Sequence, residues 1–186
     1  MVQRGLVVRA GRGDMDAFGA LVDGSLARLD AIARLILRDT ELARDAVQEA
    51  LVRAWRDLPG LRDPDRFEAW LHRLTVHACI DLARRRRRRV IEVELTPDVE
   101  PPFADASAFL ADRDQLDRAL ARLDPQQRAA VVLRFYLELS LQETADALGV
   151  PLGTAKSRLH RALDQLRLHL TIDDTDGAAD RQERIA

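Results

Sequence analysis

The sequence has 186 residues, of which 47% are hydrophobic and 32% are charged, and its formal net charge is -2. This length and apolar content allow one ordinary domain or two small ones, and they exclude a wholly disordered chain. No apolar run approaches the ~20 residues that cross a bilayer, and the first residues lack a secretory signal, so we expect a cytoplasmic protein with no membrane partner.

The charges are segregated along the chain. Six acidic residues and no lysine or arginine lie in residues 92–112, and residues 171–186 carry five acids against two arginines. Six consecutive arginines occupy positions 84–89. This pattern predicts two basic modules, an acidic linker and an acidic tail, although the total charge is nearly neutral.

Residues 1–13 are an N-terminal extension, and residues 14–91 predict a helical bundle. Within the bundle, apolar residues recur at three- and four-residue steps in three successive stretches, which indicates three amphipathic helices. No stretch shows the alternation of a strand, so an all-α fold is expected. The same helical phase places Trp55, Phe67 and Trp70 on the apolar stripes, which favours core packing over stacking against unpaired bases.

Residues 92–112 predict a linker between two domains. Three prolines accompany the excess of acidic residues in this segment. Such a composition is typical of a solvated, semi-extended connector, because it offers little apolar surface to bury and interrupts helices.

Residues 113–170 predict a second helical domain that contains a helix-turn-helix. Capping-box patterns at Asp124 and Ser140 mark two helix starts, and Gly149 supplies the left-handed residue that ends a short helix. A short helix, a tight turn and a longer basic helix follow in the order of a helix-turn-helix. Beyond this domain, residues 171–186 predict an acidic disordered tail.

The second helix of the motif has a polar, basic face that its apolar stripe leaves toward solvent. This face contains Thr154, Lys156, Ser157, Arg158 and Arg161. Lysine and arginine donate to guanine edges or phosphates, and the hydroxyl groups suit contacts with the DNA backbone. A merely solvated face is the alternative. The consistent spacing of caps, turn glycine and small residues favours DNA binding.

The arginine block contains Arg84, Arg85, Arg86, Arg87, Arg88 and Arg89. Cations at a helix C-terminus gain a few tenths of a kcal/mol each, which accounts for two or three arginines but not for six. Such crowding of like charges indicates a polyanionic partner. An anionic membrane or a nuclear-import receptor is an alternative, but no amphipathic anchor accompanies the block, so nucleic-acid phosphates are favoured.

His72, His77 and Cys79 come nearest to a metal site, and Cys79 is the only cysteine in the sequence. On a helix His72 and Cys79 share a face, whereas His77 points elsewhere and no fourth ligand is apparent. A single cysteine also excludes an intramolecular disulfide. No nucleophile–base pair, phosphate-binding glycine loop or carboxylate pair stands out, so we expect no cofactor, no metal and no enzymatic activity.

Three segments together resemble the extracytoplasmic-function (ECF) sigma factors of bacterial RNA polymerase. The first is DAVQEALVRAW at residues 45–55, the second is FEAWLHRLTVHACIDLARRRRRR at 67–89, and the third, at 123–167, begins LDPQQRAAVVLRFY. They cover both predicted modules in order. The resemblance implies that the first module binds the clamp helices of the polymerase and the -10 promoter element, and that the helix-turn-helix reads the -35 element.

The resemblance assigns polymerase binding to Asp45, Gln48 and Glu49 on the second predicted helix. These residues lie largely off the apolar stripe and offer acceptors to arginines on a partner, although ordinary surface charge is the alternative. It also implies that the helix before the arginine block, with its preceding loop, helps to capture a flipped -10 base. His77 stands where the family usually has asparagine, which leaves the preferred -10 sequence open.

The sequence therefore predicts an all-α, two-domain sigma factor whose partners are core RNA polymerase, promoter DNA and an anti-sigma factor. A stand-alone helix-turn-helix transcriptional regulator is the main alternative, and a helical adaptor that binds RNA or acidic lipid is a weaker one. A regulator predicts a symmetric dimer on a palindromic operator, whereas a sigma factor predicts one chain on two unlike elements.

Overall fold

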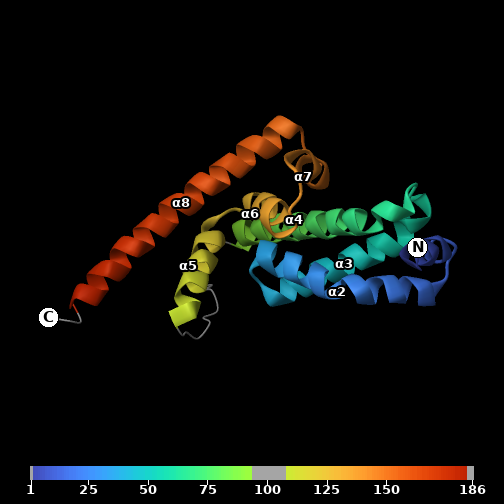
Figure 1. Ribbon diagram of the computed structural model, residues 1–186, viewed down its shortest axis with the longest axis horizontal. Coiled ribbons are helices and arrows are strands. Elements are labelled where there is room, and N and C mark those ends of the chain that lie inside the picture. Colours follow the sequence, from blue (N-terminus) through green and yellow to red (C-terminus); the bar gives the residue numbers. More distant parts are fainter. Residues whose placement is uncertain (1, 94–107, 184–186) are drawn as a thin grey trace.

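The structure is a computed structural model that describes residues 2–93 and 108–183 (Figure 1). Every regular element in these two ranges is helical, which confirms the predicted all-α class. The first range contains α1 (Val2–Ala10), α2 (Met15–Leu37), α3 (Thr40–Asp57), the 3-10 turns η1 (Leu58–Gly60) and η2 (Pro64–Arg66), and α4 (Phe67–Val93). The second contains α5 (Ala108–Arg122), α6 (Pro125–Val131), the π-helical turn η3 (Val132–Tyr136), α7 (Leu141–Leu148) and α8 (Leu152–Glu183).

Local sequence sets the starts of α2 and α3. The Asp14 carboxylate accepts a hydrogen bond from the Ala17 N–H at 3.0 Å, and Asp39 accepts from two N–H groups in the first turn of α3. Each cap satisfies donors that the first turn of a helix leaves without a partner. Arg38 adopts the left-handed conformation, with φ 58°, so α2 ends there and the chain enters α3 at once.

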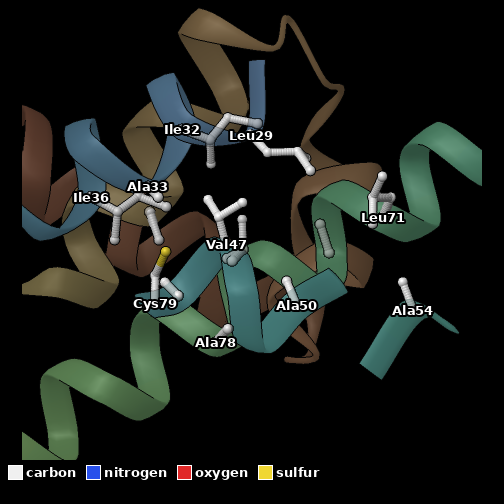
Figure 2. Packing of buried hydrophobic residues seen from close by; sticks show 14 of the residues in the cluster. Leu29, Ile32, Ala33, Ile36, Val47, Ala50, Ala54, Leu71, Ala78 and Cys79 are labelled. Atoms are coloured by element: carbon white, nitrogen blue, oxygen red, sulfur yellow. The ribbon is translucent and has the colours of Figure 1, made fainter. Parts of the chain in front are cut away.

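The main core lies between α2, α3 and α4. Figure 2 shows buried side chains converging from the three helices: Leu29, Ile32, Ala33 and Ile36 from α2, Val47, Ala50 and Ala54 from α3, and Leu71, Ala78 and Cys79 from α4. The contribution of α3 is largely alanine, since Ala43, Ala46, Ala50 and Ala54 are all fully buried. Small side chains at a helix contact allow the helix axes to approach closely.

The N-terminal extension, for which the sequence indicated no particular structure, forms α1. This helix packs against α2 and η2. Val7 and Ala10 are buried and belong to the main core. The first module therefore begins near residue 2 in the structure.

The second module packs against the first. α6, η3 and α7 contact α2 and α4, and Ala129, Ala130, Leu133 and Leu148 are part of the main core. α5 and α8 enclose a smaller core made of Ala119, Leu120, Leu123, Ala162 and Leu166. The two modules that the sequence distinguishes thus share a hydrophobic core in this structure.

Arg128 links the two modules. Its buried guanidinium donates to the Ile36 carbonyl, near the end of α2, at 2.6 Å, and to three carbonyls at and just beyond the end of α5. Burial lowers the pKa of Arg128 from its ordinary value. A second link joins Arg38 Nη1 to Asp117 Oδ1 at 2.7 Å. Hydrogen bonds from a charged donor are stronger than neutral ones, so Arg128 and Arg38 each provide a strong polar contact between the modules.

Two predicted segments differ in extent from the structure. The predicted linker falls mainly on residues 94–107, which lie outside the described residues, and α5 already begins at Ala108. α8 continues through residues 171–183, where composition predicts a disordered tail. No proline interrupts this stretch, and acidic charge by itself does not stop an existing helix from propagating.

Candidate DNA and protein interfaces

α7, the following turn and α8 form the predicted helix-turn-helix. Glu143 N–H donates to Ser140 Oγ at 3.2 Å, and Ser140 N–H donates to the Glu143 carboxylate at 2.8 Å, so both halves of the capping box are present. The box at Asp124 is complete in the same way. Gly149 ends α7 in the left-handed conformation, with φ 65°. The helix starts and the turn that the sequence predicts are therefore confirmed.

The predicted DNA-binding side chains of α8 lie in its first three turns. Thr154, Lys156, Ser157 and Arg161 are exposed, and Arg158 is half-buried. Ser157 Oγ donates to the Thr154 carbonyl at 3.0 Å, and Arg161 Nε donates to the Ser157 carbonyl at 3.3 Å. These exposed contacts within one helix can exchange for contacts with DNA, so four of the five side chains are directly accessible to a ligand.

The pKa of Arg158 is shifted by burial and by charges on its own helix and on other helices. Burial lowers its pKa, the negative charge of Asp124 opposes that change, and the positive charges of Arg84 and Arg161 lower the pKa further. Arg84 belongs to α4 and Arg158 to α8. The packed arrangement therefore brings arginines of the two basic modules into each other's field.

The arginine block divides into two sets. Arg85 Nη2 lies 2.6 Å from Glu49 Oε2, and Arg86 Nη1 lies 2.6 Å from Asp39 Oδ2, so these two arginines are held by acids at α3. Arg84, Arg87 and Arg88 are exposed and form no ion pair with any side chain in the described ranges; the Arg89 side chain is outside that description. Sequence reasoning treated all six arginines alike.

The predicted polymerase-binding residues lie on one side of α3. Asp45 and Gln48 are exposed, and the Glu49 side chain is 28% exposed. The Glu49 carboxylate accepts hydrogen bonds from both Arg53 and Arg85. Asp45 and Gln48 thus present acceptors directly to solvent, whereas the acceptors of Glu49 already have partners within the chain.

An open groove of ≈ 910 Å³ lies between α2 and α3, next to Gln48. Apolar side chains that line it include Met15, Phe18, Leu26, Leu51, Val52 and Trp55. Met15 and Val52 are 66% and 63% exposed, an arrangement typical of a protein-binding surface. The sequence analysis places Trp55 on a core stripe and does not predict the groove. An apolar residue off the stripe of α3, Val52, is the signal that could have revealed it.

His77 lies under the helix-turn-helix. Its imidazole is half-buried and lies against the backbone of α7 near Ala147 and Gly149. Burial lowers the pKa of His77, and the nearby charge of Arg73 lowers it further. This packing covers the residue that the resemblance associates with the -10 element. Of the three aromatic residues placed on apolar stripes, Phe67 is fully buried, Trp70 is partly buried against the main core, and Trp55 is partly buried but also lines the groove.

Cys79 is buried in the main core, where burial raises the pKa of its thiol to about 12. At such a pKa the thiol is almost entirely protonated near neutral pH, which makes it a poor nucleophile and a poor metal ligand. The part of the chain that the structure describes contains no cluster of three or more potential metal ligands. Within the same residues, no helix is both long and apolar enough to cross a membrane.

Comparison with known proteins gives matches to both modules. Residues 21–89 match Sigma-70 region 2, and residues 113–166 match Sigma-70, region 4. The RNA polymerase sigma-E factor of Streptomyces coelicolor is 38% identical over 161 residues, which are 84% of this chain and 90% of the relative. The ECF RNA polymerase sigma factor SigM of Mycobacterium tuberculosis is 40% identical over 154 residues, which are 83% of this chain and 77% of the relative.

Two solved structures have a similar fold. CnrH, in complex with the cytosolic domain of CnrY, is 30% identical with a TM-score of 0.63, and the match covers 93% of this chain and 99% of CnrH. The sigma factor RpoE, in complex with the anti-sigma factor NepR from Bartonella quintana, is 26% identical with a TM-score of 0.69, over 84% of this chain and 98% of RpoE. A stand-alone helix-turn-helix regulator does not explain matches that span both modules. The chain therefore belongs to the extracytoplasmic-function sigma factors of bacterial RNA polymerase.

Proposed function

We propose that this sigma factor engages core RNA polymerase through α3 and promoter DNA through α4 and α8. As a member of its family, the chain binds core RNA polymerase and directs promoter recognition and transcription initiation. The proposal assigns these activities to particular surfaces. The observation that carries it is the position of two exposed residues of α3: Gln48 lines the apolar groove, and Asp45 lies one turn before Glu49 on the same helix.

The polymerase-binding surface consists of Asp45, Gln48 and Glu49 together with the groove between α2 and α3. A partner helix with an apolar stripe flanked by arginines fits this surface, because the stripe can enter the groove while guanidinium groups reach the carboxylates. Apolar burial then supplies most of the affinity, and the acids contribute orientation and specificity.

The DNA-binding surfaces have different tasks. Thr154, Lys156, Ser157, Arg158 and Arg161 read the -35 element from α8, since base edges in the major groove accept hydrogen bonds from such donors. The arginine block contacts phosphates near the -10 element, which gives affinity rather than sequence discrimination. A direct role for His77 at the -10 element requires that α7 first moves away from α4, because α7 covers the imidazole.

The protein acts by binding rather than by catalysis, and it acts in the cytoplasm, where it meets polymerase and promoter DNA. An anti-sigma factor is a further proposed partner. Support comes from the similar RpoE structure, which is a complex with the anti-sigma factor NepR. Because the two modules pack against each other, an anti-sigma factor can contact both modules at the same time.

The deciding experiment is a core-polymerase titration with Asp45→Lys. Reversal of this exposed charge should weaken assembly roughly tenfold and lower run-off transcription in parallel, because it places a cation opposite the partner's arginines. Glu68→Lys, an exposed charge reversal in the first turn of α4, is the matched control and should bind core normally. Wild-type affinity of Asp45→Lys, with the helical circular dichroism unchanged, contradicts the assignment.

A further inference from the structure

Glu49 belongs to two surfaces at once. It lies on α3 one helical turn after Asp45, on the side proposed to face polymerase. Its Oε2 atom also accepts a hydrogen bond from Arg85 Nη2 at 2.6 Å, across 36 positions of sequence. Arg85 is part of the arginine block proposed to face promoter phosphates. One carboxylate therefore contacts both the polymerase-binding helix and the DNA-binding helix.

Two arginines pair with Glu49, and they differ in whether a second acid is close to them. Arg53 has one, and Arg85 has none among the described residues. Arg53 donates to Glu49 and also lies 3.5 Å from Asp81, so it keeps an acid if Glu49 turns away. Arg85 forms no other ion pair within residues 2–93 and 108–183. Removal of Glu49 therefore frees Arg85 in particular. The Glu49 and Arg85 side chains are 28% and 45% exposed, so partners of either residue can reach the pair.

We propose that Glu49 couples polymerase binding to DNA binding by giving up Arg85 when it accepts a cation from core polymerase. In the free chain Glu49 holds Arg85 and lowers its availability to phosphates. A polymerase arginine that takes the carboxylate breaks this ion pair, and Arg85 becomes able to bind DNA. The inference rests on the proposed polymerase-binding surface. Linkage is reciprocal, so a phosphate that takes Arg85 also makes Glu49 more available to polymerase.

The expected size of the coupling follows from the exposure of the pair. Partly exposed ion pairs contribute little, so release of Arg85 should change DNA affinity by no more than about fivefold. The salt dependence gives a sharper signal. The quantity to compare is the slope of log K against log salt concentration. Each additional phosphate bound makes this slope steeper by about 0.7 for single-stranded DNA, whatever the absolute affinity.

The first experiment uses the free chain and a fluorescent single-stranded DNA of mixed sequence, followed by anisotropy over a range of salt concentrations. Glu49→Gln should bind up to about fivefold more tightly than wild type, with a slope steeper by about 0.7. The double variant Glu49→Gln/Arg85→Gln should lack both effects. Asp57→Asn removes one negative charge and the partner of Arg56 at the C-terminal end of α3, and it is the matched control for net charge and for loss of an ion pair outside the arginine block.

The second experiment repeats the salt titration with holoenzyme on a pre-melted promoter. Arg85 is then free in both proteins, so wild type and Glu49→Gln should have the same slope. For the free chain, the salt concentration at which wild type and Glu49→Gln elute from heparin gives the same comparison where binding is too weak for anisotropy. The inference is overturned if Glu49→Gln fails to gain affinity in the free chain, if Asp57→Asn gains as much, or if the difference in slope persists in holoenzyme.

Core-binding titrations separate this inference from the proposed function. Asp45→Asn and Glu49→Gln should both weaken assembly, but only Glu49→Gln should alter DNA binding by the free chain. If Asp45→Asn weakens assembly and Glu49→Gln does not, the polymerase-binding surface stands and the coupling fails. If neither variant weakens assembly, the surface assignment itself is wrong.

Discussion

The imidazole of His77 in α4 packs against Gly149, the residue that ends α7. A Cβ atom placed on Gly149 would lie 3.5 Å from His77 Nε2, which is ordinary van der Waals distance. The two residues are 72 positions apart and come from the two different modules. Their contact is part of the packing that brings the helix-turn-helix onto the first module, and it makes that packing sensitive to both pH and backbone conformation.

Stability of the packed chain should fall as pH decreases through the range in which His77 titrates. Burial lowers the pKa of His77 below its ordinary value of 6.5, so the unfolded chain binds this proton more tightly than the folded chain. The contribution is therefore complete above pH 6.5 and is lost as pH falls through the folded pKa. His77→Asn should flatten the pH dependence of the urea-unfolding midpoint. The dependence that remains includes His72, whose pKa burial also lowers. An unchanged pH dependence in His77→Asn contradicts the prediction.

Gly149→Ala should destabilise the chain by about 1–2 kcal/mol. The cause is the left-handed backbone, with φ 65°, rather than crowding against His77. Gly149→Asn should cost less, because asparagine tolerates this conformation. Gly153→Ala in the first turn of α8, where a Cβ would meet open space, is the control and should be neutral or slightly stabilising. Urea unfolding measures all three, and equal effects at the two glycines would exclude backbone strain as the cause.

Arg128→Met should destabilise the chain by roughly 2–5 kcal/mol. The substitution leaves four buried or partly buried carbonyl groups without their shared donor, and one of them belongs to the other module. Arg34→Met removes an exposed pair with Asp30 and should cost less than about 1 kcal/mol. Chemical unfolding of both variants tests the difference. A small effect of Arg128→Met would show that water replaces the guanidinium, and that Arg128 does not hold the modules together.

The arginines of the block that form no ion pair with any described side chain, Arg84, Arg87 and Arg88, should contribute most of the DNA binding by the free chain. Replacing Arg84, Arg87 and Arg88 with glutamine removes exposed cations that lack ion-pair partners among the described side chains. The salt dependence on single-stranded DNA should become shallower by about 0.7 for each phosphate that the variant no longer binds. The double variant Arg85→Gln/Arg86→Gln should change the slope less, because acids at α3 already hold these two side chains. Equal changes per arginine would show that the ion pairs do not restrict the block.

The elements that sequence predicted well are those that short-range chemistry determines. Asp124, Ser140 and Gly149 fix helix ends through contacts within a few residues, so their roles follow from spacing alone. The apolar periodicity of α2 to α4 identifies the bundle for the same reason. The exposed donors of α8 also follow from helical phase, because a buried stripe on one side leaves the other side to solvent.

The interactions that sequence missed join residues far apart in the chain. Nothing near Glu49 indicates that Arg85 is its partner, and nothing near His77 indicates contact with α7. Leu26 fits the apolar stripe of α2 but is 42% exposed, because no element of the described chain covers that side of the helix. Periodicity identifies a face that can be buried. It does not identify the element that buries it, and here part of the face remains open as a groove.

The alanine face of α3 places a volume limit on one side of this helix. Ala43, Ala46, Ala50 and Ala54 leave no space for larger side chains, so almost any enlargement at these positions pushes α2 and α4 apart. The opposite side of the same helix, which includes Val52 and Gln48, meets no such volume limit. Substitutions there can retune partner choice while the fold is retained. One helix thus combines a side limited by volume with a side limited only by the partner that binds it.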